Sequence, residues 1–167
     1  FSVLFALYHY VTAGIGVPVD FWHMGAHMSG VIILIFISFP AFKKLQGDGQ
    51  SSDVMGRLAG VPFYDWLFIV IGVMSSLYVG VTWYGLDLNV FGFTYSIPEQ
   101  VLRMGVPLPV DVVFGTLLII VLLEAVRRTI GIIVPIIILL FTGYAVLGPY
   151  IPIQILKHPG LSWSLFV

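Results

Sequence analysis

Two long apolar runs, separated by one short charged segment, restrict the fold of this chain more than any other feature. The first run lies between Asp111 and Glu124 and the second is Ile130–Leu147, and neither contains a charged residue. With their flanks, both approach the roughly 20 residues that a helix needs to cross a hydrocarbon layer of about 30 Å. A lone strand would leave its backbone polar groups unpaired in lipid. The sequence therefore predicts a hairpin of two transmembrane helices.

The composition places the rest of the chain in a membrane as well. Of its 167 residues 59% are hydrophobic and 9% are charged, and the mean hydropathy is +1.07. Soluble domains usually carry about 25% charged residues. The predicted fold class is all-α, a polytopic transmembrane helical bundle with about five membrane spans in a single transmembrane domain, residues 1–167. The predicted spans are 1–14, 20–42, 64–84, 110–126 and 130–148.

The first predicted span is too short to cross a bilayer. Because the chain starts at Phe1 without a methionine, we expect it to be a piece of a longer polypeptide whose preceding residues complete this helix. Two other features follow from residue spacing. Gly72, Ser76 and Gly80 form a small-residue stripe that predicts close helix packing. The segment between Gly85 and Pro109 is predicted to be an aqueous loop.

Basic residues predict the orientation of the spans. Five of them lie in the loop after the second span or in the turn after the fourth, and two lie in loops on the opposite side. The positive-inside rule places the larger group in the cytoplasm. The larger group is Lys43, Lys44, Arg57, Arg127 and Arg128, and the smaller is Arg103 and Lys157.

The charged segment Glu124–Thr129 is predicted to form a structural turn at the cytoplasmic surface. Glu124 can reach Arg127 at i+3 and Arg128 at i+4 along a helix. Ionisable residues within a membrane merit the hypothesis of a proton or anion site. These residues lie at a helix end within reach of the headgroups, so the structural role is favoured. Three acidic residues in first helical turns are predicted to be helix caps. They are Asp20, Asp65 and Asp111.

The sequence contains no pattern typical of an active site. It lacks cysteine, a nucleotide-binding glycine loop and a catalytic triad, so we expect no enzyme activity and no catalytic, cofactor-binding or metal-binding residues. The net charge of −1 gives no reason to expect nucleic acid binding. His23 and His27 have the spacing of metal ligands on one helix face. A packing role is favoured for both, as it is for the isolated His9.

One sequence pattern resembles a known family. The segment Leu122–Gly131, followed by Pro135 and by Gly148-Pro149-Tyr150, is similar to fused permeases of tripartite ATP-independent periplasmic (TRAP) transporters. The closer similarity is to permeases that work with TAXI-type binding proteins. The Leu-Glu-Ala-x-Arg-Arg-Thr motif is the most specific part of this resemblance. Three further stretches fit in the same order: Phe39–Lys44, Val61–Trp66 and Gly105–Pro107.

The resemblance implies a function and a set of partners. The chain corresponds to the N-terminal, small-subunit-like module of the permease, whose large transmembrane module follows in the same polypeptide and carries the substrate and sodium sites. A periplasmic TAXI-type solute-binding protein delivers the substrate. We therefore expect a scaffold module, in contact with membrane lipid, of a sodium-driven importer of organic acids or similar small solutes in a bacterial or archaeal inner membrane. The small module of this family has four spans, one fewer than predicted here.

Two alternative functions remain open at the sequence level. One is a membrane-anchor subunit of an electron-transfer complex, with haem ligated by His23 or His27. The other is a membrane protein that acts alone. An optical spectrum distinguishes the first alternative from a transporter module, because bound haem gives a Soret band.

Overall fold

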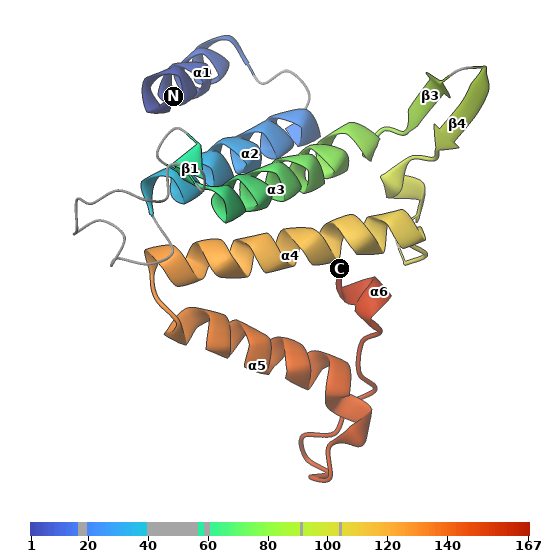
Figure 1. Ribbon diagram of the computed structural model, residues 1–167. Coiled ribbons are helices and arrows are strands. Elements are labelled where there is room, and N and C mark those ends of the chain that lie inside the picture. The colour runs from blue at the N-terminus through green and yellow to red at the C-terminus, as the bar shows by residue number, and fades with distance from the viewer. Residues whose placement is uncertain (17–19, 40–56, 59–60, 91, 104) are drawn as a thin grey trace.

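The computed structural model describes residues 1–16, 20–39, 57–58, 61–90, 92–103 and 105–167. Its helices follow one another along the chain as adjacent, roughly parallel rods (Figure 1). The longer helices are α1 (Ser2–Ile15), α2 (Asp20–Ser38), α3 (Phe63–Thr82), α4 (Pro109–Thr129) and α5 (Ile133–Leu147). The shorter elements are β1 (Arg57–Leu58), β2 (Val61–Pro62), β3 (Leu86–Val90), β4 (Phe93–Ile97), η3 (Gln100–Arg103), η4 (Gly148–Tyr150) and α6 (Trp163–Phe166).

Four of the described helices are long and apolar enough to cross a membrane. They are the segments Phe21–Ser38, Phe63–Thr82, Pro109–Thr129 and Ile133–Tyr150. This confirms the predicted all-α, multi-pass architecture. Helix α1 has only 14 residues, so it is shorter than the roughly 20 residues of a typical span. Lys43 and Lys44, which contribute to the predicted orientation, lie outside the described residues.

Small residues allow helices α2 and α3 to approach each other closely. A Cβ atom on Gly25 would lie 2.8 Å from the carbonyl oxygen of Ser76, and one on Gly80 would lie 2.9 Å from that of Phe21. One turn away from these glycines on each helix, the side-chain oxygens of Ser29 and Ser76 are hydrogen-bonded at 2.7 Å. The predicted stripe on α3 is confirmed, because all three of its residues are buried. Helices in lipid pack through such small residues and interhelical hydrogen bonds.

The apolar core lies where α2, α3 and α4 meet. Five side chains form its buried centre: Ile32, Phe36, Ile69, Val121 and Ala125. Helix α5 differs, because its apolar side chains are mostly exposed, as expected for a helix that faces lipid or another protein. The buried core of the molecule therefore belongs to the three-helix unit α2–α4.

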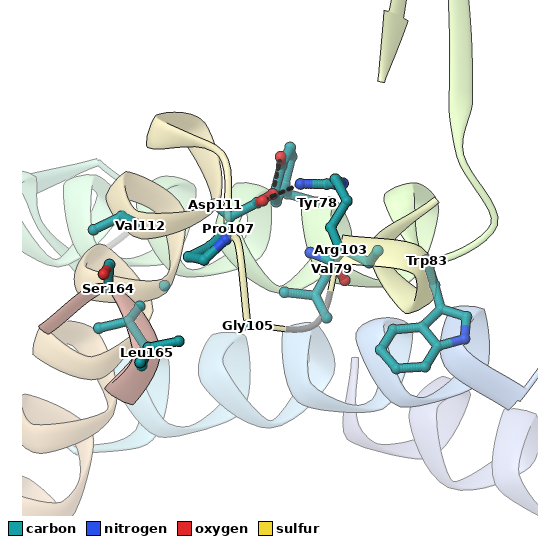
Figure 2. Close-up of a pocket in the computed structure, with 13 residues that line it drawn as sticks. Tyr78, Val79, Trp83, Arg103, Gly105, Pro107, Asp111, Val112, Ser164 and Leu165 are labelled. Atoms are coloured by element: carbon teal, nitrogen blue, oxygen red, sulfur yellow. Dashed lines mark hydrogen bonds and ion pairs between the residues drawn. The ribbon is translucent and has the colours of Figure 1, made fainter. Parts of the chain in front are cut away.

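A charged side chain fixes the start of α4. The carboxylate of Asp111 accepts a hydrogen bond from the backbone N–H of Leu108 at 2.8 Å, which confirms its predicted role as a helix cap. It also accepts one from the hydroxyl of Tyr78 at 2.6 Å and forms an ion pair with Arg103 (Figure 2). The same carboxylate thus joins α3, η3 and α4.

The segment between α3 and α4, predicted as an aqueous loop, contains regular structure that the sequence analysis did not predict. It contains an antiparallel hairpin in which β3 pairs with β4 from Leu86 opposite Ile97 to Val90 opposite Phe93. Gly92, with a φ of 84°, lies in the connection, where glycine avoids the strain of a left-handed conformation. The hairpin extends away from the helices (Figure 1).

Candidate functional site

The charged residues of the Leu-Glu-Ala-x-Arg-Arg-Thr motif lie within α4 and not in a turn. The predicted helix end at Val126 was wrong, because α4 continues to Thr129. Its last turn is closed by hydrogen bonds, including the one from the N–H of Ile130 to the carbonyl of Val126 at 2.9 Å. The chain reverses just beyond, where Gly131 has a φ of 108°. Glutamate, alanine and arginine favour helix, so glycine sets the end of α4.

Glu124 pairs with both arginines, as the sequence predicted. Its two carboxylate oxygens each accept a hydrogen bond of 2.7 Å from the guanidinium of Arg127. One of these oxygens also accepts a bond of 2.8 Å from Nε of Arg128. Such two-point contacts hold the geometry of both ions more tightly than a single contact would.

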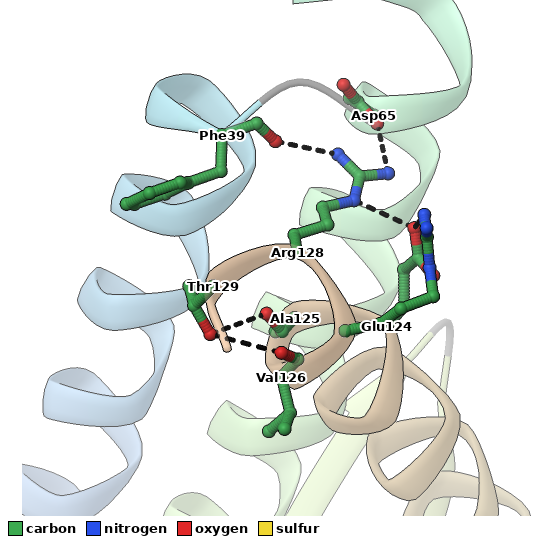
Figure 3. A network of polar contacts seen from close by, with 8 residues as sticks. Phe39, Asp65, Glu124, Ala125, Val126, Arg128 and Thr129 are labelled. Atoms are coloured by element: carbon green, nitrogen blue, oxygen red, sulfur yellow. Dashed lines mark hydrogen bonds and ion pairs between the residues drawn. The ribbon is translucent and has the colours of Figure 1, made fainter. Parts of the chain in front are cut away.

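Arg128 connects three helices (Figure 3). Its Nη2 lies 2.6 Å from a carboxylate oxygen of Asp65 on α3, and its Nη1 donates to the carbonyl of Phe39 at 3.3 Å, just beyond α2. The side chains of Arg128 and Asp65 are 1% and 0% exposed. We call Asp65, Glu124, Arg127 and Arg128 the Arg128 clamp.

The predicted role of Asp65 as a helix cap was wrong. Helix α3 has no side-chain hydrogen bond at its N-cap, and the carboxylate of Asp65 turns toward α4 instead. The sequence holds a signal for this pair that we missed. Consecutive spans cross the membrane in opposite directions, so the start of α3 and the end of α4 lie on the same side. Asp65 at the start of α3 is therefore on the same side as the two arginines at the end of α4. For Asp20 the structure describes only the backbone at the start of α2.

Aromatic rings surround the buried guanidinium of Arg128. Its central carbon lies 4.4 Å from the ring centre of Phe36 and 5.8 Å from that of Phe68. These two rings stack on each other with centres 5.3 Å apart. A cation is attracted to the face of an aromatic ring. The clamp thus lies in an apolar environment, in which an unpaired charge is costly.

The clamp has little capacity to bind a charged ligand. Its two carboxylates and two guanidinium groups balance, and they are directed at one another. Removing one member would leave its partner buried without a counter-ion. The arrangement therefore suits a fixed joint between α2, α3 and α4.

The histidines form a separate cluster between α1 and α2. Nδ1 of His27 lies 3.0 Å from Nε2 of His9, and Nδ1 of His23 lies 2.9 Å from the hydroxyl of Tyr8. Residue spacing alone does not indicate that His9 lies beside the other two histidines. In the described residues no group of three or more His, Asp or Glu side chains is placed to hold a metal ion. The contacts of these histidines pack α1 on α2.

Comparisons with known proteins give no relative for this chain. No family model, no curated protein and no solved structure matches it. The function must therefore be argued from the residues and from their geometry.

Proposed function

We propose that this chain is the membrane-embedded scaffold module of a TRAP-type secondary transporter permease. The permease imports organic acids or similar small solutes, driven by a sodium gradient, and receives them from a periplasmic TAXI-type binding protein. A large transmembrane module carries the transport sites. The present chain braces the fixed part of that module in the inner membrane.

The Arg128 clamp is the observation that carries this proposal. The charged residues of the resembling motif, Glu124, Arg127 and Arg128, are engaged in contacts that join spans of the same chain. A transporter that carries solute usually binds it near the midplane, at broken helices with free polar groups. In the described spans Asp65 and Asp111 lie in first helical turns, Arg127 and Arg128 lie in the last turn of α4, and Glu124 lies about one turn before them. This distribution favours a brace.

The number of long helices also supports the proposal. The small module of the resembling family has four spans, and four described helices are long and apolar enough to cross a membrane. The exposed apolar surface of α5 is suited to contact with a second transmembrane module or with lipid.

Reconstitution of the permease that contains this chain tests the proposal. Proteoliposomes are loaded with the purified permease, supplied with its binding protein and given radiolabelled organic acids. We expect uptake only when both an inward sodium gradient and the binding protein are present. A Soret band in the purified protein, together with no sodium-dependent uptake, would instead support the haem-binding anchor. Dissipating the gradient with a sodium ionophore is the control.

Cysteine labelling tests the orientation, because the chain has no cysteine of its own. Ser96 is exposed on β4, and Ile130 is 71% exposed after α4, at the opposite end of the bundle. In intact cells, Ser96→Cys should react with a membrane-impermeant thiol reagent and Ile130→Cys should not. In inverted membrane vesicles, Ile130→Cys should react and Ser96→Cys should not. The opposite pattern would reverse the topology and contradict the proposed fit to the family.

A further inference from the structure

The β3–β4 hairpin has one apolar face and one polar face. In a strand, successive side chains point to opposite faces, and residues paired across two strands share a face. The register pairs Leu86 with Ile97 and Leu88 with Tyr95, whereas Asp87 pairs with Ser96 and Asn89 with Thr94. We call the first group, together with Phe93, the apolar face. The second group is the polar face, where Thr94 donates to the side-chain oxygen of Asn89 at 2.6 Å.

The apolar face is open along most of its length. Ile97 at the base is only 7% exposed, but Leu88 is 41%, Tyr95 is 55% and Phe93 is 81% exposed. A single two-stranded hairpin is marginally stable in water. An exposed face of this composition therefore indicates another surface that covers it.

The position of the hairpin indicates which surface this is. Helix α3 ends at Thr82 and β3 begins at Leu86, so the base of the hairpin lies where a span leaves the membrane. Trp83 and Tyr84 occupy the connection, and Trp83 stacks on Phe21 at the start of α2 with ring centres 3.6 Å apart. Tryptophan and tyrosine are enriched at the membrane–water interface. The base of the hairpin therefore lies beside aromatic residues that are typical of headgroup depth.

We propose that the apolar face of the β3–β4 hairpin rests on the lipid bilayer, with Leu88, Phe93 and Tyr95 at the boundary between headgroups and acyl chains. Each strand has five residues, which at about 3.3 Å per residue gives a length of roughly 16 Å. The hairpin is connected to a span on each side, because α3 precedes β3 and α4 follows β4 after η3. The polar face remains in water. This inference does not depend on the proposed transport function.

The charge of the hairpin predicts which lipids it contacts. The only ionisable carboxylate between Leu86 and Ile97 is Asp87, on the polar face, and this segment has no lysine or arginine. Interfacial binding combines buried apolar area with attraction of basic residues to anionic lipid. The hairpin has no basic residue, so only the burial of apolar area can contribute to its binding. The contact should therefore form on a zwitterionic phosphatidylcholine bilayer and persist at high salt.

Spin labels on neighbouring residues test this placement. The full-length protein carries one cysteine at a time, Tyr95→Cys or Leu88→Cys on the apolar face, and Thr94→Cys or Asn89→Cys on the polar face as matched controls. After nitroxide labelling in phosphatidylcholine nanodiscs, collisions are measured with oxygen, which concentrates in hydrocarbon, and with a nickel chelate, which stays in water. We expect a several-fold higher oxygen-to-nickel ratio on the apolar face, unchanged at high salt.

The other outcomes overturn the proposal. Equal ratios on the two faces would show that the hairpin projects into water. Labels at Tyr95 and Leu88 that are shielded from both reagents would show that a protein surface covers the apolar face. Because Tyr95 and Thr94 are adjacent, a local failure of folding would affect both positions and cannot imitate the expected difference.

Discussion

Replacement of Arg128 by methionine should remove most of the folded protein from the membrane. The change leaves Asp65, which is 0% exposed, as an unpaired carboxylate among apolar side chains. Removing one partner of a buried ion pair costs about 3–5 kcal/mol, a large part of a total stability of about 5–15 kcal/mol. The folded fraction in mild detergent, measured by size-exclusion chromatography, and the midpoint of thermal unfolding should both fall sharply.

Three further variants distinguish the loss of the Arg128 contacts from the general effect of removing a charge. Arg127→Ala should cost much less, since Arg127 is 34% exposed and, among the described residues, its ion pair is with Glu124. In the Arg128→Met background, Asp65→Asn should recover more folded protein than Glu124→Ala, because Glu124 retains Arg127. Normal folding of Arg128→Met, or equal losses at both arginines, would contradict the role assigned to the clamp.

Larger side chains at Gly25 or Gly80 should separate α2 from α3. Even a Cβ atom at these positions meets backbone oxygen at 2.8 or 2.9 Å, and backbone cannot move aside as a flexible side chain can. We expect Gly25→Leu and Gly80→Leu to lower the free energy of unfolding by about 1–3 kcal/mol or more. Thermal unfolding of the purified variants measures the change.

Gly143 in α5 supplies the matched control for these substitutions. A Cβ atom there meets nothing within 4 Å, and the residue lies inside a helix like the other two. Gly143→Leu should therefore leave the unfolding midpoint close to that of the unchanged protein. If Gly80→Leu were tolerated equally well, the close packing of α2 on α3 would not be needed for stability.

Length and apolar composition were sufficient to predict that this chain forms long apolar helices. The hydrocarbon layer requires long apolar helices, so the presence of α4 and α5 follows from composition. The end of α4 at Thr129 does not, because the charged residues continue the helix as far as the turn at Gly131. Local spacing also predicted the contacts of Glu124, because partners at i+3 and i+4 need no tertiary information.

Contacts between distant residues were not predicted. The pair of Asp65 with Arg128 depends on how α3 packs on α4, and the contact of His9 with His27 depends on how α1 packs on α2. The hairpin was missed for a different reason. The alternation in Leu86–Val90 is typical of a strand with one apolar face, but its polar residues favoured a loop prediction.

Transport kinetics of the Arg127→Ala, Arg128→Ala double variant test the proposed scaffold role most directly. The permease is reconstituted with its binding protein, and initial uptake rates are divided by the amount of folded permease in the liposomes. A scaffold role predicts less folded permease with unchanged apparent affinities for substrate and sodium. A double variant that reaches normal membrane levels but has lost affinity for substrate or sodium would place the clamp in the transport mechanism and contradict the scaffold role.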